Sequence, residues 1–378
     1  MKILYGVQAT GNGHISRARA LAEAFRNHDV DVTWLFSGRE RSQLFDMVPF
    51  GDFRHCRGLT FATRAGSVRY WRTLRQNHLP RFLRDVRALP LAGFDLVVTD
   101  FEPVTAWAGR RAGVPTIGIG HQYAFGPNTP IAGGHWLARQ IMSRFAPVDR
   151  PVGLHWHPYN DNVLPPILDL PAQRGETGDH VLVYLPFEDA SAVSALLQQF
   201  PAIQFRLYGP GLGAAEHGNV SLRPTSVEDF KRDLARCSGV ICNSGFELIS
   251  ECLQWRKPVL TKPLTGQMEQ LSNALALAQL GHATVVARLD TESLGPWLLQ
   301  RPAPPALRFA DVADALAGWL AAGARTEIAT LQQQLWRDTA RSTEPNTGAP
   351  VRPARMVTSP SWPRQRQRVE LGNLAGMG

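Results

Sequence analysis

Short apolar runs alternate with helical patterns along most of this 378-residue chain, and this alternation limits the fold more than any other feature. The first series runs from a strand expected at Lys2–Val7 to one expected at Val114–Gly120. The second begins with a strand at Val181–Leu185 and includes a strand at Pro258–Thr261. Strands that alternate with helices predict parallel sheets joined by helical crossovers. We therefore predict an α/β fold with two Rossmann-like, doubly wound halves, whose facing strand ends form a cleft of the kind that binds ligands.

Composition marks the boundaries between these series. Residues 147–178 are rich in Pro, Asn, Asp and Gly, which is typical of an irregular connection. Past Arg337 the chain is rich in Pro, Arg and Ser with little periodicity, which predicts disorder. The expected parts are an N-terminal domain at 1–150, a linker at 151–178, a C-terminal domain at 179–336 and a basic Pro-rich tail at 337–378.

Charge and cysteine usage narrow the class of protein. The formal net charge of +8 favours an anionic partner, which is a nucleotide, a membrane surface or a nucleic acid. The chain has no uninterrupted apolar stretch of about 18 residues, so we expect no transmembrane helix, and its first residues resemble a strand more than a signal peptide. The four cysteines have no CxxC or zinc-type spacing, which predicts reduced, buried thiols. We expect a cytoplasmic protein, with peripheral attachment to the inner face of the plasma membrane as an option.

A glycine-containing loop, Gly11–His14 (GNGH), stands between the first strand and a helix expected from about Ser16. Glycines let the backbone approach a ligand closely, and a helix N-terminus favours anions. Ser16 occupies the place of the third glycine in GxGxxG, and the strand at Val30–Phe36 ends at Ser37 without an acid for the ribose of NAD. A nicotinamide cofactor is therefore not expected. His14 is a candidate general base, and a histidine that caps the helix is the structural alternative.

An apolar strand expected at Asp95–Thr99 places Asp100 at the edge of the same cleft. A carboxylate at this position could accept a hydrogen bond from His14, fix its tautomer and stabilise its protonated form. A helix N-cap or turn carboxylate is the alternative for Asp100. Glu102 is a candidate for binding an acceptor.

Two polar segments follow strands of the second series. Asn243–Gly245 leads directly into a helix, whose free N–H groups and dipole suit a diphosphate. Glu247 and Glu251 are four residues apart and share one face of that helix, where a carboxylate can accept two hydrogen bonds from a ribose diol. Two solvated acids are the alternative. The segment Lys262–Asn273 offers glutamine and glutamate side chains that match sugar hydroxyls, or else it is a polar surface loop.

These segments together resemble the donor-binding half of GT-B glycosyltransferases, and in particular a family 28-like group. That group contains the bacterial peptidoglycan N-acetylglucosaminyltransferase and the diacylglycerol glycosyltransferases. Its pattern has a glycine, a glutamate six residues later and a proline seven residues after that, which here are Gly245, Glu251 and Pro258. Its Gln-Gln-x-x-Asn-Ala segment corresponds to Glu269–Ala274, with Glu in place of the first Gln. The resemblance covers roughly residues 1–330, although the N-terminal loop has fewer glycines than that of the peptidoglycan enzyme.

The resemblance implies an inverting hexosyltransferase that takes a sugar from a nucleotide-diphosphate sugar, with UDP-sugars as the first choice. The acceptor is a hydroxyl compound, and lipid-linked and cell-envelope compounds are among the candidates. His14 would face the reaction centre with Asp100 as its partner, and no cofactor or metal is expected, because no DxD-type pair stands at a strand end. The expected donor-binding residues are Gly13, Arg223, Asn243, Ser244, Gly245, Glu247, Glu251, Gln267, Glu269 and Gln270. The expected acceptor-side residues are Asn12, Glu102 and His121.

The segment Arg64–Arg87 contains seven arginines and one aspartate among aromatic and leucine residues, and Pro80 is expected to divide it into two helices. Basic amphipathic helices favour anionic lipid surfaces, whereas a solvated helix packed on its own domain is the alternative. Two other functions stay open at this stage. One is a sugar-nucleotide epimerase of the same architecture, and the other is a non-catalytic nucleotide or nucleic-acid binding protein. No RNA- or DNA-binding motif is present, so a nucleic-acid partner is not expected.

Overall fold

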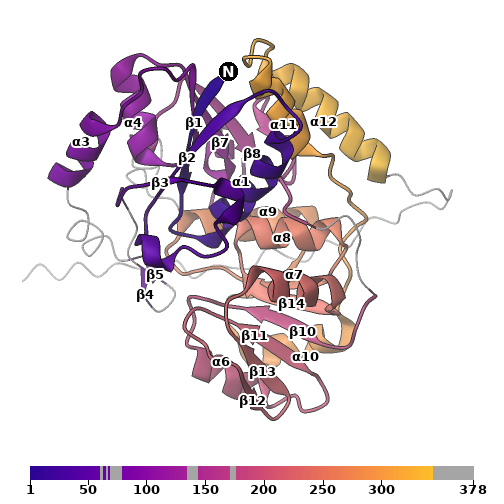
Figure 1. Ribbon diagram of the computed structural model, residues 1–378. Coiled ribbons are helices and arrows are strands. Elements are labelled where there is room, and N and C mark those ends of the chain that lie inside the picture. Colours follow the sequence, from indigo (N-terminus) through magenta and orange to yellow (C-terminus); the bar gives the residue numbers. More distant parts are fainter. Residues whose placement is uncertain (60–62, 65–66, 69–78, 134–143, 171–175, 344–378) are drawn as a thin grey trace, which may run out of the picture. The chain divides into compact units, whose positions relative to one another are not determined.

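The structure is a computed structural model that describes residues 1–59, 63–64, 67–68, 79–133, 144–170 and 176–343. Within these residues the chain forms two seven-stranded sheets (Figure 1). The strands of the first sheet, in spatial order, are β3 (Arg54–His55), β2 (Asp31–Ser37), β1 (Lys2–Gln8), β6 (Leu96–Asp100), β7 (Thr116–Gly120), β8 (Arg150–Leu154) and β9 (Val163–Leu164). Those of the second are β12 (Ala215–His217), β13 (Val220–Arg223), β11 (Phe205–Tyr208), β10 (Val181–Tyr184), β14 (Gly239–Asn243), β15 (Val259–Lys262) and β16 (Thr284–Val285).

All neighbouring strands of the two sheets run parallel in the described residues, apart from the antiparallel pair of β12 and β13. A small hairpin of β4 (Thr63–Arg64) and β5 (Ser67–Val68) is separate from them. The predicted α/β fold with two doubly wound halves is therefore confirmed.

The described helices are α1 (Asn12–Phe25), α3 (Leu79–Ala88), α4 (Pro103–Ala112), α6 (Ala190–Leu197), α7 (Val227–Arg236), α8 (Phe246–Gln254), α9 (Met268–Leu280), α10 (Thr291–Gln300), α11 (Val312–Ala321) and α12 (Ile328–Thr343). A short 3₁₀ turn, η3, spans His121–Ala124.

Alternate residues of each central strand pack against opposite helix layers, as the two-residue period of a strand requires. In β1, Ile3 and Tyr5 belong to the apolar cluster that includes α1 and α11, whereas Leu4 packs with α3 and α4. In β10, Val183 packs with α6 and α10, whereas Leu182 joins the cluster of Ile3 and Tyr5. Figure 1 shows α8 and α9 between the two sheets, where residues of both helices belong to that shared cluster. One apolar core therefore connects the two halves, which lie in a single compact unit.

The last two helices return to the first sheet. The guanidinium of Arg150, at the start of β8, donates a hydrogen bond of 3.1 Å to the carbonyl oxygen of Thr326. The indole N–H of Trp336 in α12 donates to the carbonyl oxygen of Val163 in β9 at 2.7 Å. Although α11 and most of α12 fall in the range assigned to the C-terminal domain, they pack on N-terminal elements.

The tail begins later than its composition suggests. Residues 337–343 continue α12, where we expected the irregular tail to start. Leu335, at 3% exposure, and Trp336 hold the preceding turn of the helix against the first half. Residues 344–378 lie outside the described part of the chain.

The prediction that residues 147–178 are irregular is wrong for β8 and β9. Pro151 and Gly153 disfavour a strand by local propensity, which is why the sequence pattern did not indicate one. The packing of the sheet overrides this preference. A Cβ atom at position 153 would lie 2.6 Å from the Cα of Ala124, so only glycine allows β8 to approach η3 this closely.

We expect Gly153→Ala to destabilise the protein by about 1–3 kcal/mol, because the atoms that its methyl group would meet belong to backbone and cannot rotate away. Thermal unfolding followed by circular dichroism measures the effect. Gly213→Ala is the matched control, since a Cβ at position 213 meets no described atom within 4 Å. Equal melting temperatures of the two variants would contradict this account of β8.

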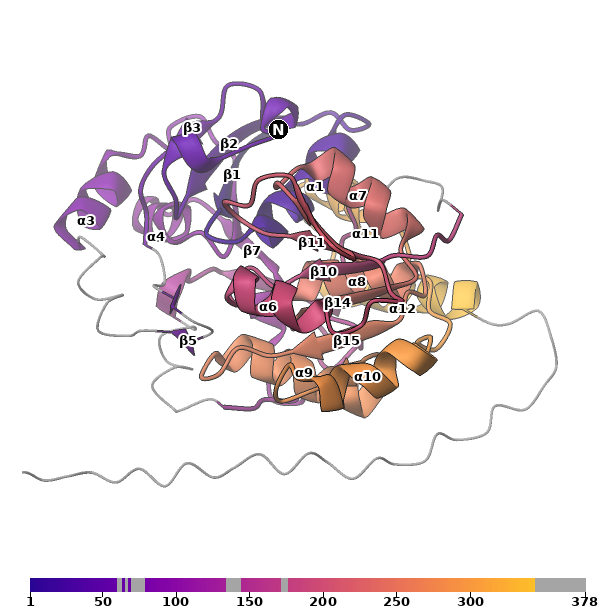
Figure 2. The ribbon, with the colours of Figure 1, turned by 90° about the horizontal axis from the view of Figure 1, so that it is seen from below.

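The basic segment Arg64–Arg87 is described only at its ends. α3 is described from Leu79 to Ala88 and includes Pro80. The helix expected before Pro80 lies outside the described residues. In both views α3 lies beside α4, on the side of the first sheet away from α11 (Figures 1 and 2). Among the described helices none is long and apolar enough to cross a membrane.

Candidate active site

Two adjoining cavities lie at the carboxyl ends of the strands, between the two halves. The larger encloses about 620 Å³, which is within the roughly 300–1,000 Å³ typical of small-molecule sites. The loop after β1 borders it on one side, and the segments after β10 and β14 border it on the other. The residues that line both cavities are Asn12, Gly13, Phe45, Tyr184, Thr225, Glu247 and Leu248.

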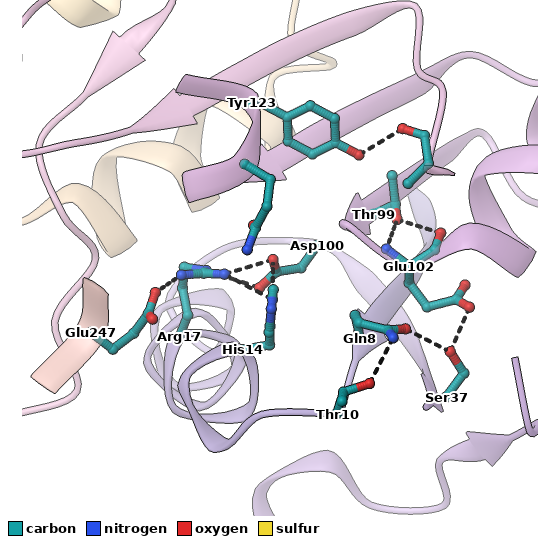
Figure 3. Close-up of polar contacts among 12 residues, drawn as sticks. Gln8, Thr10, His14, Arg17, Ser37, Thr99, Asp100, Glu102, Tyr123 and Glu247 are labelled. Carbon is teal, nitrogen blue, oxygen red and sulfur yellow. Dashed lines mark hydrogen bonds and ion pairs between the residues drawn. The ribbon is translucent and has the colours of Figure 1, made fainter. Parts of the chain in front are cut away.

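His14 and Asp100 meet, as the sequence predicted. α1 begins at Asn12, four residues before the predicted start, so His14 lies in its first turn. Nδ1 of His14 lies 2.8 Å from Oδ1 of Asp100, the last residue of β6 (Figure 3). A carboxylate can only accept, so this contact requires a proton on Nδ1, and Nε2 then has the free lone pair that a general base requires. Nη2 of Arg17, which also lies 3.0 Å from Nδ1, then donates to Oδ1 of Asp100 instead. Burial raises the pKa of Asp100, but the Arg17 guanidinium and His14 outweigh it and hold the pKa below its usual value.

Arg17 is a part of this arrangement that sequence reasoning missed. Its Nε donates to Oδ2 of Asp100 at 2.9 Å, and its Nη2 donates to Oδ1 at 2.7 Å. Its Nη1 forms an ion pair with Glu247 of α8, although the Arg17 side chain is only 1% exposed. The spacing of three residues between His14 and Arg17 on one helix was the available signal, because such residues share a face. A side chain at Gly13 would collide with the Glu247 carboxylate, which explains the glycine there.

Glu251 is a buried acid, not a solvated one. It is 4% exposed, borders the smaller cavity and forms an ion pair with Lys231 of α7. Burial raises the pKa of Glu251 to about 7, even though Lys231 acts in the opposite direction. Lys231 also lies 3.9 Å from Asp169, which accepts a hydrogen bond of 3.0 Å from Arg19 of α1. Sequence reasoning identified neither Lys231, the partner of Glu251, nor Asp169 and Arg19 beyond it.

The segment Asn243–Gly245 joins β14 to α8, as predicted. Asn243 and Gly245 line the larger cavity, and Gly245 is the N-cap residue of α8. The hydroxyl of Ser244 is fully buried and shares a hydrogen bond of 2.9 Å with the hydroxyl of Thr261 on β15. Its carbonyl oxygen accepts from the side-chain amide of Asn273 at 3.0 Å, and Ser244 is not in the described lining of either cavity, so the donor contact expected of it is not seen.

The polar side chains at the start of α9 form hydrogen bonds within the protein, where we expected them to bind sugar hydroxyls. Gln267 is the N-cap of α9 and accepts from the backbone N–H of Gln270 at 3.2 Å. Gln270 lines the larger cavity, while its Oε1 accepts from the N–H of Leu264 at 2.9 Å. Glu269 accepts from the side-chain amide of Gln122 in the first half at 3.1 Å. Arg223 lies 3.7 Å from Glu216 and is not among the described residues that line either cavity.

Of the three expected acceptor-side residues, Asn12 lines both cavities, and its Oδ1 accepts from Arg39 at 3.0 Å. Glu102 is fully buried as the N-cap of α4 and accepts from the N–H of Thr105 at 2.6 Å and from the hydroxyl of Ser37 at 2.7 Å. Burial raises the pKa of Glu102 despite these hydrogen bonds. The N-cap role considered for Asp100 is thus taken by Glu102.

His121 is also interior. Its Nδ1 lies 2.8 Å from the carbonyl oxygen of Leu154, its Nε2 lies 2.7 Å from Oδ1 of Asn273 in α9, and its ring stacks on Phe246 at 4.0 Å. Burial lowers the pKa of His121. The residue thus joins the two halves, and neither cavity includes it among its described lining.

Aromatic side chains that the sequence analysis did not single out surround the smaller cavity. Phe45 comes from the first half, and Tyr184, Tyr208 and Phe230 come from the second. Aromatic faces of this kind stack on planar rings such as nucleobases. In the described part of the chain, no group of three or more His, Cys, Asp or Glu side chains is placed to hold a metal ion.

Two doubly wound parallel sheets with a cavity at their facing strand ends define the GT-B class of glycosyltransferases. Residues 1–302 match the family described as glycosyl transferase family 1. The chain therefore belongs to glycosyl transferase family 1 and is a glycosyltransferase of the GT-B type, which confirms the predicted class of enzyme.

Solved structures of the same fold share little sequence with this chain. The glycosyltransferase SsfS6 of Streptomyces sp. SF2575, complexed with thymidine diphosphate, is 15% identical over 89% of this chain and 99% of its own, with a TM-score of 0.53. The glycotransferase of kitacinnamycin is 15% identical over 89% of this chain and 98% of its own, with a TM-score of 0.55. MurG of Acinetobacter baumannii is 15% identical over 88% of this chain and 99% of its own, with a TM-score of 0.49. No curated protein matches the chain significantly.

Proposed function

We propose that this glycosyltransferase moves a sugar from a nucleotide-diphosphate sugar to a hydroxyl acceptor in one inverting step that needs no metal. The observation that carries the proposal is that two groups come together where the two halves meet. His14 of the His14–Asp100 pair follows Gly13, which lines both cavities, although the described linings include neither His14 nor Asp100, and Gly245 at the N-terminus of α8 lines the larger cavity. The first group suits proton removal and the second suits an anionic leaving group.

In this mechanism Nε2 of His14 takes the proton of the acceptor hydroxyl as its oxygen attacks the anomeric carbon. The bond from that carbon to the diphosphate oxygen breaks at the same time. The free N–H groups in the first turn of α8 and the helix dipole stabilise the charge that develops on the diphosphate. Asp100 accepts from Nδ1 and stabilises the imidazolium that forms.

The donor occupies the second half. Glu251 accepts from the ribose hydroxyls, and the aromatic side chains around the smaller cavity enclose the base. UDP-sugars are the first donors to test. Thymidine diphosphate sugars are the second, because a glycosyltransferase of the same fold was crystallised with thymidine diphosphate.

Calorimetric titration with UDP, TDP, GDP and their sugars tests the donor assignment. Tight binding of one nucleotide supports it, whereas no binding of any of them overturns it. Mass spectrometry of the bound sugar nucleotide after incubation then separates the reaction classes. An epimerised sugar nucleotide would identify an epimerase, whereas transfer onto an added hydroxyl compound identifies the transferase.

We also propose a membrane-associated acceptor, reached through the basic segment. On α3, Leu79 and Leu83 are exposed at 56% and 47%, beside the exposed Arg81, Arg84 and Arg87. Exposed leucines among arginines suit an anionic lipid surface.

We expect the protein to sediment with phosphatidylcholine vesicles that contain phosphatidylserine, and less with pure phosphatidylcholine. Arg81→Glu with Arg84→Glu should reduce this binding, whereas Arg110→Glu with Arg111→Glu, the same charge change on neighbouring α4, should reduce it less. Failure of the unmodified protein to bind either vesicle would remove the membrane proposal.

A further inference from the structure

Four charged or chargeable side chains form a row that crosses from the first half to the second. Figure 3 shows Arg17 between Asp100 and Glu247, with His14 on the Asp100 side. Asp100 and Arg17 are 0% and 1% exposed, and Glu247 and His14 are 18% and 15% exposed. Water therefore screens these charges poorly, and each one acts strongly on its neighbours.

Arg17 donates two hydrogen bonds to Asp100, and its positive charge changes how strongly Asp100 can stabilise an imidazolium at His14. An aspartate alone gives an imidazolium a partner of opposite charge. Here the guanidinium cancels that charge and lies 3.0 Å from Nδ1 of His14 through its Nη2, where it opposes protonation of the ring. Glu247 supplies a second carboxylate on the far side of Arg17. The row thus carries one net negative charge with neutral His14 and none with protonated His14.

We infer that Glu247 is a positioning residue for the His14 base: acting through Arg17, it supplies from the second half the negative charge that favours the protonated ring. This inference rests on the proposed role of His14 as general base, and it gives Glu247 a role other than the donor contact expected from the sequence. It makes the strength of the base in the first half depend on contact with α8 of the second.

The other titratable groups around the row do not supply this charge. Burial raises the pKa of the Tyr5 phenol on β1 and of the Tyr123 phenol on η3, so both stay neutral. Burial lowers the pKa of His121, so it stays uncharged. Glu269 on α9 accepts a hydrogen bond from Gln122 and acts electrostatically on His121.

The test is an NMR titration of the ligand-free protein, with the His14 ring signal assigned by its loss in His14→Gln. Glu247→Gln should lower the titration midpoint of His14 by about one pH unit, and Arg17→Met should raise it by a similar amount. Glu247→Asp should recover part of the shift. Glu251→Gln is the matched control, because Glu251 is an acid on the same helix that pairs with Lys231 instead of Arg17, and it should leave the His14 midpoint unchanged.

Shifts of opposite sign support the inference, because loss of structure alone would not produce them. If Arg17→Met does not fold, the His14 midpoint of Glu247→Gln is compared with that of Glu251→Gln. This comparison still tests the inference, because Gln keeps the shape of Glu. An unchanged His14 midpoint in Glu247→Gln overturns the inference. The titration needs no donor or acceptor, so its result does not depend on transferase activity. An absence of transferase activity would refute the proposed function, and the titration would still test the coupling between Glu247 and His14.

Discussion

Replacing His14 with alanine is expected to lower turnover by on the order of 100-fold or more. The reason is geometric, because Asp100 holds Nδ1 and leaves Nε2 as the free base, next in sequence to Gly13 of the cavity lining. Donor affinity should stay near that of the unmodified protein, since the expected donor contacts lie in the second half. Steady-state turnover at saturating donor, together with calorimetry of the nucleoside diphosphate, measures both quantities.

His28→Ala is the matched control for His14→Ala. His28 belongs to the same half and lies just beyond the end of α1, where it pairs with Asp314 at 3.0 Å, and it lines neither described cavity. Its loss should leave turnover within about twofold of normal. If His14→Ala retains normal turnover, His14 is not the base and the mechanism needs another group.

Glu251→Ala is expected to weaken binding of the nucleoside diphosphate by roughly 10- to 100-fold, because hydrogen bonds to a charged, buried acceptor are strong. The same residue predicts a pH dependence of binding. Burial raises the pKa of Glu251 to about 7, so the acid gains a proton as the pH falls through that value. A protonated carboxyl group accepts fewer hydrogen bonds from a diol. Affinity should therefore rise more steeply between about pH 6 and pH 8 in the unmodified protein than in the variant, and this difference separates Glu251 from the terminal phosphate of the ligand, which also ionises near pH 6.

Calorimetry at several pH values measures this profile. Glu216→Ala, the loss of an exposed acid on β12 of the same half, is the control and should change affinity little. Equal affinities of Glu251→Ala and the unmodified protein would move the ribose contact elsewhere. A flat profile in the unmodified protein would show that a charged Glu251 is not what the nucleotide binds.

Much of the fold follows from sequence patterns that are local. The central strands are buried on both faces, so they appear as apolar runs, and most were predicted to within one or two residues. The meeting of His14 and Asp100 could also be predicted. His14 follows β1, Asp100 ends β6, and these two strands are parallel neighbours in which Val7 pairs with Asp100. Residues at the carboxyl ends of such strands lie at one edge of a sheet.

The rest depends on contacts between distant parts of the chain. Arg17 and Lys231 resemble ordinary helix-surface charges in the sequence, and only the packing of α1 and α7 against the site makes them partners of Asp100 and Glu251. Glu102 lies two residues after Asp100, the end of β6, yet it is buried as the N-cap of α4. Glutamate is an unusual cap, because the common ones are the shorter Ser, Thr, Asp and Asn, so no local pattern predicts a cap at Glu102.

The return of α11 and α12 to the first sheet has a consequence for how the protein is made. Leu316 and Leu320 of α11 lie in the same buried cluster as Ile3 and Tyr5. A ribosome releases β1 long before α11, so the first half waits for α11 and α12 before its core closes. We expect a nascent chain that stops before Val312 to expose apolar side chains on the α1 side of that sheet, and we expect chaperones to bind them.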